Sequence, residues 1–310
     1  MTRISVVGSL NMDLVIQTDR MPLAGETISG GDFSLIPGGK GANQAIAAAK
    51  AGAETHMYGC VGEDKFGDVL LASLETAKVD TSGITKNSLS HSGVAAILLE
   101  KSGENRIIVN SGANNLVDRA YVDSHWDDIG QSSLIILQHE IPLSTCHYII
   151  EKAHQTPIPV LLNPAPFHEI PKDLLAKIDY LVLNEVELQG ILPVEIDSIE
   201  KVIQAGKAIN KMGVRQVLIT LGGDGAVLVS AEEAIYQPAF AVDVADTTAA
   251  GDTFVGYFAA AIVSGFGQAQ ALINSCGAAA LAVTKVGAQS SIPCSEAVLR
   301  FVQNKTLEGV

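Results

Sequence analysis

The chain has 310 residues, of which 47% are apolar, and its formal net charge is −14 at pH 7. This is enough for one large α/β domain, or for a large domain with a smaller appendage. So acidic a chain repels nucleic acid and anionic membranes, which excludes both as expected partners. Because the chain is negatively charged overall, its electrostatic field repels anionic ligands. Such a ligand would have to be held by local groups, namely Mg²⁺ and backbone amides.

Most of the chain alternates short β-branched runs with longer alanine-rich runs. The expected strands are residues 4–8, 56–61, 134–138, 160–163, 180–183 and 217–221. The expected helices are residues 42–51, 66–77, 143–155, 199–212, 250–263 and 269–283. This alternation predicts an α/β fold with a doubly wound, mostly parallel sheet flanked by helices. The strands are apolar on both sides, as a sheet that is covered twice requires.

Two stretches break this alternation. Residues 14–36 are rich in Thr, Gly and Pro and offer no helix, and residues 93–99 and 106–110 form two strand-like runs around a turn at 100–105. These pieces predict a small antiparallel sheet that acts as a lid over a site at the strand ends. Ordinary surface hairpins are the alternative. An exposed strand edge and apolar face would also make this lid a dimer surface.

The expected division is therefore discontinuous in sequence. Residues 1–13, 37–92 and 111–310 form the α/β core, and residues 14–36 and 93–110 form the β-sheet lid. The N-terminus leads directly into a strand-like run, so we expect no signal peptide. No apolar stretch long enough to span a bilayer is free of polar residues. Four widely spaced cysteines, which show no metal-ligand spacing, indicate reduced thiols in a cytoplasmic protein: Cys60, Cys146, Cys276 and Cys294.

The first polar motif follows the first expected strand and contains Asn11 and Asp13. In an extended chain, side chains two residues apart point to the same side. An amide beside a carboxylate matches the vicinal hydroxyls of a polyol. A turn that uses Asn and Asp for local hydrogen bonds explains the pair equally well.

A glycine-rich loop leads into the helix expected at residues 42–51. Gly38, Gly39 and Gly41 surround Lys40, and Asn43 follows in the first helical turn. The loop lacks the spacing of a Walker A motif, because a glycine follows the lysine. Packing alone does not readily explain three glycines around one lysine. We therefore expect the backbone to approach a ligand here, with the lysine and the asparagine pointing into the same space.

Two further motifs lie where expected strands end. Glu140 is placed where ligands of open α/β sheets bind, whereas its neighbour His139 has a weaker case because a lone histidine there is more often structural. Asn184 and Glu187 have the spacing of a helix capping box, which explains them structurally. The functional alternative places them near Mg²⁺ or phosphate, acting through water molecules.

A glycine-rich turn and a helix start complete the set. Residues 220–225 read as a hairpin turn whose amides could also face a nucleotide. Residues 246–254 run through small residues to a single carboxylate, Asp252, at the start of an apolar helix. Backbone amides without partners at a helix start bind anions. Thr248 or Ala249 is a better N-cap candidate than Asp252, which leaves this carboxylate inside the first turn with a different role. A base beside an anion hole is what phosphoryl transfer to an alcohol requires.

Three of these stretches, residues 38–44, 184–187 and 246–254, together with Asn163-Pro164-Ala165-Pro166, resemble the ribokinase (PfkB-type) family of carbohydrate kinases. The resemblance covers residues 4–301, and four more segments sit as in family members that act on ribose: residues 9–13, 103–105, 112–114 and 287–293. It implies a ribokinase-like fold and ATP-dependent phosphorylation of the 5-hydroxyl of D-ribose to ribose 5-phosphate. It also implies a homodimer through the lid.

The alternatives are a kinase for deoxyribose, another pentose or a ketohexose, and a non-catalytic sugar sensor on the same fold. A Rossmann dehydrogenase is a weaker option, because no Gly-x-Gly-x-x-Gly follows the first strand.

The resemblance also implies residue roles for the sugar and the chemistry. The sugar hydroxyls would be held by Asn11, Asp13, Gly39, Lys40, Asn43 and Glu140. Asp252 would accept the proton of the 5-hydroxyl and contact the sugar. The anion hole would be made by the amides of Ala249, Ala250, Gly251 and Asp252.

For the nucleotide and the metals, the resemblance implies further residues. ATP would be bound by Asn184, Thr220, Gly222, Gly223, Gly225, Gly251 and Cys276, with Glu187 near Mg²⁺. A K⁺ ion beside the anion hole would be held, mostly through backbone carbonyls, by Asp246, Thr248, Ala282, Lys285, Gly287 and Ser291. The family usually has Asn or His where this chain has Cys276. A thiol is a weak hydrogen-bonding group. Nucleotide affinity or selectivity therefore differs, or a small side chain simply packs against the base.

Overall fold

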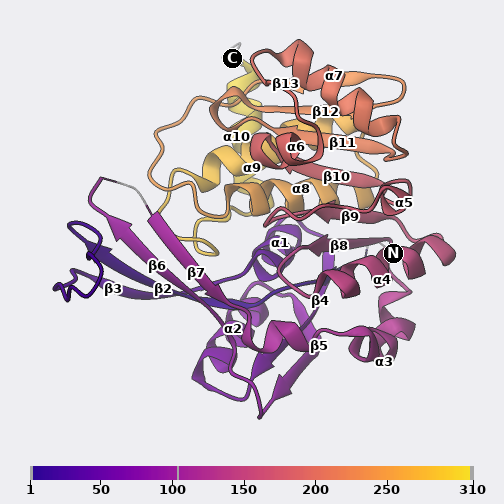
Figure 1. Cartoon of the computed structure of the whole chain (residues 1–310). Helices are drawn as coiled ribbons and strands as arrows, with labels where there is room; N and C mark the ends of the chain where they lie inside the picture. Colours follow the sequence, from indigo (N-terminus) through magenta and orange to yellow (C-terminus); the bar gives the residue numbers. More distant parts are fainter. Residues whose placement is uncertain (1–2, 103–104, 308–310) are drawn as a thin grey trace.

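The computed structural model describes residues 3–102 and 105–307. A large sheet crosses the molecule between two layers of helices, and a smaller sheet projects from one side (Figure 1). From edge to edge, the large sheet contains β13 (Ala234–Gln237), β12 (Ala226–Ser230), β11 (Gln216–Thr220), β10 (Tyr180–Asn184), β9 (Val160–Asn163), β8 (Leu134–Gln138), β1 (Arg3–Val7), β4 (Glu54–Gly62) and β5 (Asp80–Asn87). Only β12 runs antiparallel to its neighbours, which confirms the expected doubly wound, mostly parallel sheet.

The described helices are α1 (Lys40–Lys50), α2 (Lys65–Thr76), α3 (Arg119–Ile129), α4 (Leu143–Gln155), α5 (Lys172–Leu175), α6 (Glu185–Ile191), α7 (Ile199–Asn210), α8 (Ala250–Val263), α9 (Gln268–Ala282) and α10 (Ser295–Leu307). Every strand and helix expected from the sequence is present, with each end within two residues of its expected place. The elements that were not anticipated are mostly polar, such as α3 and the edge strand β5.

Alternate residues of the central strands supply two separate hydrophobic cores. In β8, Leu134 and Ile136 pack into one core while Ile135 and Leu137 pack into the other. The first core is closed by α1, α2, α8, α9 and α10, and the second by α3, α4, α6 and α7. A strand with apolar side chains on both faces is what a doubly covered sheet requires.

The helices α1 and α8 approach each other unusually closely. A Cβ atom on Gly256 of α8 would lie 2.4 Å from the Cβ of Ala47 and 2.6 Å from the carbonyl oxygen of Gln44, both in α1. Small residues on both helices therefore allow the two backbones to touch, because a tightly packed interior has no room for a further methyl group. This contact brings the amino-terminal turns of the two helices together.

The smaller sheet is the predicted lid. Its order is β3 (Phe33–Gly38), β2 (Asn11–Thr18), β6 (Gly93–Glu100) and β7 (Asn105–Asn110). The central pair, β2 and β6, is parallel, so the sheet is mixed and not wholly antiparallel as expected. The expected turn at 100–105 and the family-like segment 103–105 fall partly on residues 103 and 104, which lie outside the described residues.

The lid strands are continuous with two of the sequence motifs. Asn11 begins β2 and Asp13 is its third residue, so both side chains belong to the strand that leaves the core for the lid. Gly38 ends β3 immediately before α1. No helix among the described residues is long and apolar enough to cross a membrane. The four cysteines are unpaired, as expected, and only Cys294 is exposed.

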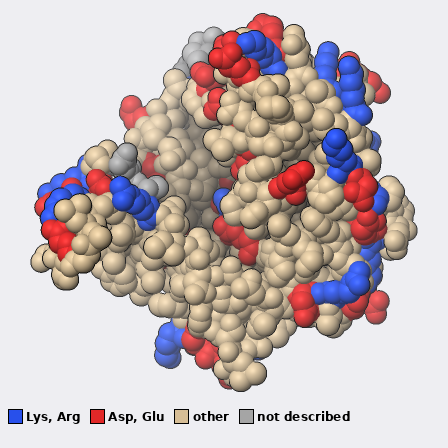
Figure 2. Space-filling model, viewed as in Figure 1, with Lys and Arg blue, Asp and Glu red and all other residues tan. Residues whose placement is uncertain are grey.

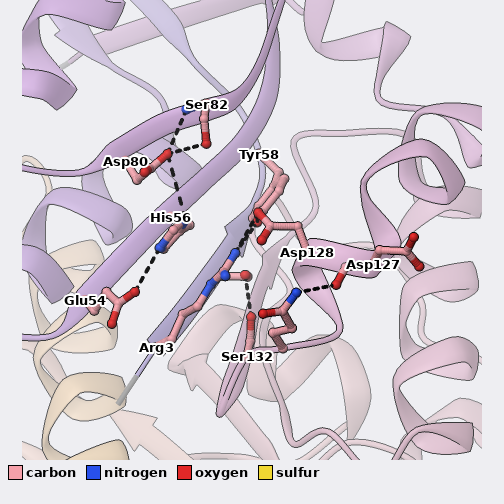
Figure 3. A network of polar contacts seen from close by, with 11 residues as sticks. Arg3, Glu54, His56, Tyr58, Asp80, Ser82, Asp127, Asp128 and Ser132 are labelled. Carbon is pink, nitrogen blue, oxygen red and sulfur yellow. Dashed lines mark hydrogen bonds and ion pairs between the residues drawn. The ribbon is translucent and has the colours of Figure 1, made fainter. Parts of the chain in front are cut away.

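A polar network lies near the amino-terminal ends of the strands, at the opposite end of the sheet from the carboxyl ends of the strands (Figure 3). The guanidinium of Arg3 donates to the hydroxyl of Tyr58 at 2.7 Å and pairs with Asp128 at 2.7 Å. That hydroxyl donates to Asp128 at 2.5 Å. The hydrogen bonds from Arg3 and Tyr58 lower the pKa of Asp128 to about 2.

We predict that Asp128→Asn lowers the free energy of unfolding by about 1–2 kcal/mol at pH 7, since it weakens a charge-assisted network around the buried Arg3. The folded-state pKa of this aspartate lies below its usual value, so its ionised carboxylate stabilises the folded protein above about pH 4. This stabilisation fades as the pH falls towards 2. Urea unfolding at pH 7 and at pH 3 measures both effects.

The neighbouring exposed Asp127 provides the matched control. Asp127→Asn changes the same charge and is expected to alter stability by less than about 0.5 kcal/mol. Equal losses in the two variants would contradict a specific role for the Arg3 network.

Candidate active site

Two adjoining cavities open at the carboxyl ends of the central strands, where the surface is hollowed between the lid and the main body (Figure 2). The larger cavity has a volume of about 450 Å³ and the smaller one about 210 Å³. Four residues line both cavities: Thr220, Thr247, Ala250 and Gly251. The start of α8 therefore stands between the two.

Asp252 lies in the first turn of α8 and is almost fully buried. Its two carboxylate oxygens each accept a hydrogen bond of 2.9 Å, one from the side-chain amide of Asn43 and one from that of Gln44. Both donors belong to the first turns of α1. The close contact of α1 with α8 thus holds the carboxylate between two amides, and it lines the smaller cavity.

The backbone at this helix start suits an anion. Ala249 precedes α8 in the left-handed region, with φ of 59°, and the helix has no side-chain cap. The amide of Ala250 donates to the carbonyl of Thr247, and the following amides belong to the first turn, where a helix supplies no backbone acceptor. A Cβ on Gly251 would meet nothing within 4 Å, so a ligand has room to approach this turn.

Glu140 binds the polar groups that follow β1. One of its oxygens accepts hydrogen bonds from the hydroxyl of Ser9 at 2.5 Å, the backbone amide of Lys40 at 3.0 Å and the side-chain amide of Asn11 at 3.4 Å. Asn114 supports this arrangement by donating to the side-chain oxygen of Asn11 at 2.8 Å. The carboxylate thus fixes the beginning of α1 against the beginning of β2.

Four carboxylates share this region with one lysine: Asp13, Glu140, Glu187 and Asp252. Burial and the neighbouring Glu140 and Asp252 raise the pKa of Asp13 to about 7, although Lys40 opposes the rise. Burial alone would lower the pKa of Lys40, but the surrounding carboxylates outweigh that effect and raise it. The lysine is therefore charged, and the Asp13 carboxyl takes up a proton close to neutral pH.

The glycine-rich loop has a packing explanation, which corrects the expectation drawn from the sequence. A Cβ on Gly38 would lie 2.5 Å from a carboxylate oxygen of Asp13, and one on Gly41 would lie 2.5 Å from the amide of Ser9. Gly39 has φ of 92°, where only glycine is unstrained. These glycines let the loop press against residues 8–13. Three glycines whose Cβ would meet nothing within 4 Å line the larger cavity: Gly222, Gly223 and Gly251.

Asn184 and Glu187 form the capping box of α6 that the sequence indicated. The side chain of Asn184 accepts from the amide of Glu187 at 2.8 Å, and Glu187 accepts from the amide of Asn184 at 2.9 Å. Burial raises the pKa of Glu187 above its usual value. Both residues also line the smaller cavity, so the structural role and a ligand role are compatible.

The larger cavity is mostly apolar. Its walls include Phe240, Val242, Val244 and Cys276, and the turn at 222–225 forms part of its rim. Cys276 is 7% exposed, and burial raises the pKa of its thiol to about 12, so the group is neutral. A flat aromatic ligand could be held here chiefly by contact with apolar side chains.

The residues expected to bind K⁺ lie in the loop before α8, at the end of α9 and in the loop after it, and Asp246 joins the two loops. One oxygen of this carboxylate accepts from the amide and the hydroxyl of Thr248, at 2.9 and 2.6 Å. The other accepts from the amide of Gly287 at 2.9 Å. These hydrogen bonds with Thr248 and Gly287 offset the effect of burial and lower the pKa of Asp246. In the described part of the chain, no three His, Cys, Asp or Glu side chains are placed to hold a metal ion together.

Sequence reasoning assigned no role to several polar residues that the structure brings to the site. Gln44, Gln138 and Asn163 connect the strand ends to Asp252, and Asn114 orients Asn11. For Gln44, the sequence offered one signal: it is a polar side chain in an otherwise alanine-rich helix. His139 is buried, and burial lowers its pKa to about 4, which agrees with a structural role.

A buried carboxylate at a helix start, between a polar cavity and an apolar one, defines an α/β enzyme that transfers phosphoryl groups to an alcohol. Comparison with known proteins then narrows the class. Residues 1–294 match the pfkB family of carbohydrate kinases, and the chain belongs to this family.

Curated relatives and solved structures match almost the whole chain. Ribokinase of Schizosaccharomyces pombe is 41% identical, covering 94% of this chain and 95% of that protein. Deoxyribokinase of Salmonella typhimurium is 35% identical, covering 94% and 96%. The structure of Arabidopsis thaliana ribokinase with ribose and ATP superposes with a TM-score of 0.92 at 34% identity, covering 97% and 99%.

Proposed function

We propose that this carbohydrate kinase transfers the γ-phosphoryl group of ATP to the 5-hydroxyl of D-ribose, giving ribose 5-phosphate and ADP. The observation that carries the proposal is the position of Asp252, held by two amides beside the first-turn amides of α8 and between two cavities. The similarity to ribokinases, one of them solved with ribose and ATP, supports the choice of substrates.

The sugar occupies the region where the lid meets the core. Asn11 donates to Glu140, Asp13 lies near Glu140 and Lys40, and Asn43 donates to Asp252. The amides and carboxylates of these residues match the hydroxyls of a pentose. The backbone of Gly39 lines the same corner. In this arrangement the 5-hydroxyl of the sugar reaches the carboxylate of Asp252.

Asp252 then acts as the general base. A carboxylate is a much weaker base than an alkoxide, so it accepts the hydroxyl proton only as the oxygen–phosphorus bond forms. The amides of residues 249–252 face the charge that develops on the transferring phosphoryl group. The larger cavity holds the nucleoside, with Cys276 against the base and the glycines of 222–225 along the ribose and phosphates.

Two metal ions belong to this proposal. Both oxygens of Glu187 are engaged by Asn184, which leaves lone pairs suited to water molecules of a Mg²⁺ ion that neutralises the phosphates. K⁺ is held by oxygens of the loops that Asp246 ties together: those of Thr248, Ala282, Lys285, Gly287 and Ser291. It would stiffen the loop before α8. Exchanging K⁺ for Na⁺ at constant ionic strength tests this role, and an unchanged turnover would contradict it.

The lid also supports a homodimer. Its edge strands carry exposed apolar side chains: Phe33, Leu35, Ile107, Ile108 and Val109. Covering them with the same surface of a second copy would remove both exposed edges from water. Sedimentation equilibrium of the purified chain tests this, with twice the 32.4 kDa chain mass expected and a single chain mass contradicting it. A cytoplasmic location, in keeping with unpaired cysteines, completes the proposal.

We predict a preference of at least about tenfold in kcat/KM for ribose over 2-deoxyribose, because a site that hydrogen-bonds a hydroxyl rejects the analogue that lacks it. Fructose is the ketohexose control. A preference for 2-deoxyribose would identify the chain as a deoxyribokinase instead, in line with its relatives of that name. No ATP-dependent transfer to any sugar would favour the non-catalytic sensor.

We predict that Asp252→Asn lowers kcat by at least about 100-fold, because the general base is lost, while the sugar still binds with affinity within about threefold of the original. Steady-state kinetics measure the first effect and calorimetric titration with ribose the second. Asp127→Asn, on the exposed surface of α3, is the matched control and keeps full turnover. Near-normal turnover of Asp252→Asn would contradict the assignment.

A further inference from the structure

Gln44 is fully buried and uses both ends of its side-chain amide. Its nitrogen donates to a carboxylate oxygen of Asp252 at 2.9 Å and to the side-chain oxygen of Asn163 at 3.1 Å. Its oxygen accepts from the side-chain nitrogen of Gln138 at 2.7 Å. One side chain therefore connects the carboxyl ends of β8 and β9 to the carboxylate on α8.

The direction of this chain of amides is determined by the carboxylate. An ionised carboxylate only accepts, so the nitrogen of Gln44 must face Asp252 and its oxygen must face the nitrogen of Gln138. The oxygen of Gln138 is then left buried without a partner, against Gly8, where a Cβ would lie 2.0 Å away. A buried carbonyl oxygen without a partner is unfavourable. In return, the side-chain nitrogen of Gln138 donates to Gln44, and that of Gln44 donates to Asp252.

Asp252 needs such donors because its surroundings are crowded with charge. Asp13 on β2, Glu140 after β8 and Glu187 on α6 are the other carboxylates of the cluster, and Lys40 on α1 is the cation. Like charges this close compete for a proton. Both oxygens of Asp252 accept an N–H from α1, so its carboxylate has one defined orientation among these charges.

We propose that Gln44 is a positioning residue for the proposed phosphoryl transfer: it holds the Asp252 carboxylate in one orientation beside the first-turn amides of α8. Gln44 contacts neither reacting atom in this role. It acts through Asp252, and Asn43 supplies the second donor from the same turn of α1. The inference rests on Asp252 being the base, as the proposed function requires.

Carboxyl ¹³C NMR of aspartate-labelled protein tests the hydrogen bond from Gln44 to Asp252 without any substrate, with the Asp252 resonance identified from Asp252→Asn. In Gln44→Met the midpoint of that resonance is expected to rise by about one pH unit, because a donor to the ionised form is lost. Gln44→Glu keeps the shape but adds a competing carboxylate, and it raises the midpoint in the same direction. An unchanged midpoint in both variants overturns the inference.

Kinetics give the functional readout. In Gln44→Met the acid limb of the kcat profile moves to higher pH together with the midpoint, and kcat falls by about 10- to 100-fold with sugar KM within about threefold. Gln216→Met replaces another buried glutamine, at the far end of β11, and leaves the limb in place. A raised KM with an unmoved limb overturns the inference. If the unaltered chain shows no kinase activity, the proposed function is overturned. The contact of Gln44 with Asp252 is tested separately, because the NMR measurement needs no substrate.

Discussion

The site depends on the close packing of α1 against α8. Because Gly256 has no side chain, the backbone of α8 rests on Ala47 and on the carbonyl of Gln44. Only at that separation do two short amide side chains of α1 reach the carboxylate of Asp252. Packing of small apolar residues thus determines where a charged group lies, since two hydrogen bonds of normal length tolerate little displacement.

The same principle joins the lid to the core. Residues 8–11 leave β1 for β2, and Gly38 to Gly41 return from β3 to α1, so both connections meet beside Glu140. The glycines of the return loop allow the two backbones to touch. The side chains proposed to bind the sugar therefore lie at the junction of the two sheets. Movement of the lid would carry Asn11 and Asp13 with it, while Asp252 stays with the core.

Much of the architecture followed from local patterns. Apolar strands, alanine-rich helices and the capping box at Asn184 were all recognisable, because each depends on neighbours within a few residues. The glycine-rich loop has a packing explanation that the sequence did not suggest, while open space surrounds Gly251 and the glycines at 222 and 223. Sequence spacing does not reveal whether a missing side chain makes room for a ligand or for another part of the chain.

By itself, the sequence determined the fold class, the lid segments and most of the polar residues at the strand ends, because periodicity and turn chemistry are local properties. Only the tertiary structure decided how those residues hydrogen-bond to one another. Gln44, Gln138 and Asn163 lie on three different elements, and Gln44 can donate to Asp252 and Asn163 while it accepts from Gln138 only once α1, α8 and the sheet are packed. Hydrogen bonds between residues 94 to 208 positions apart in the chain are specified by packing, which no short segment contains.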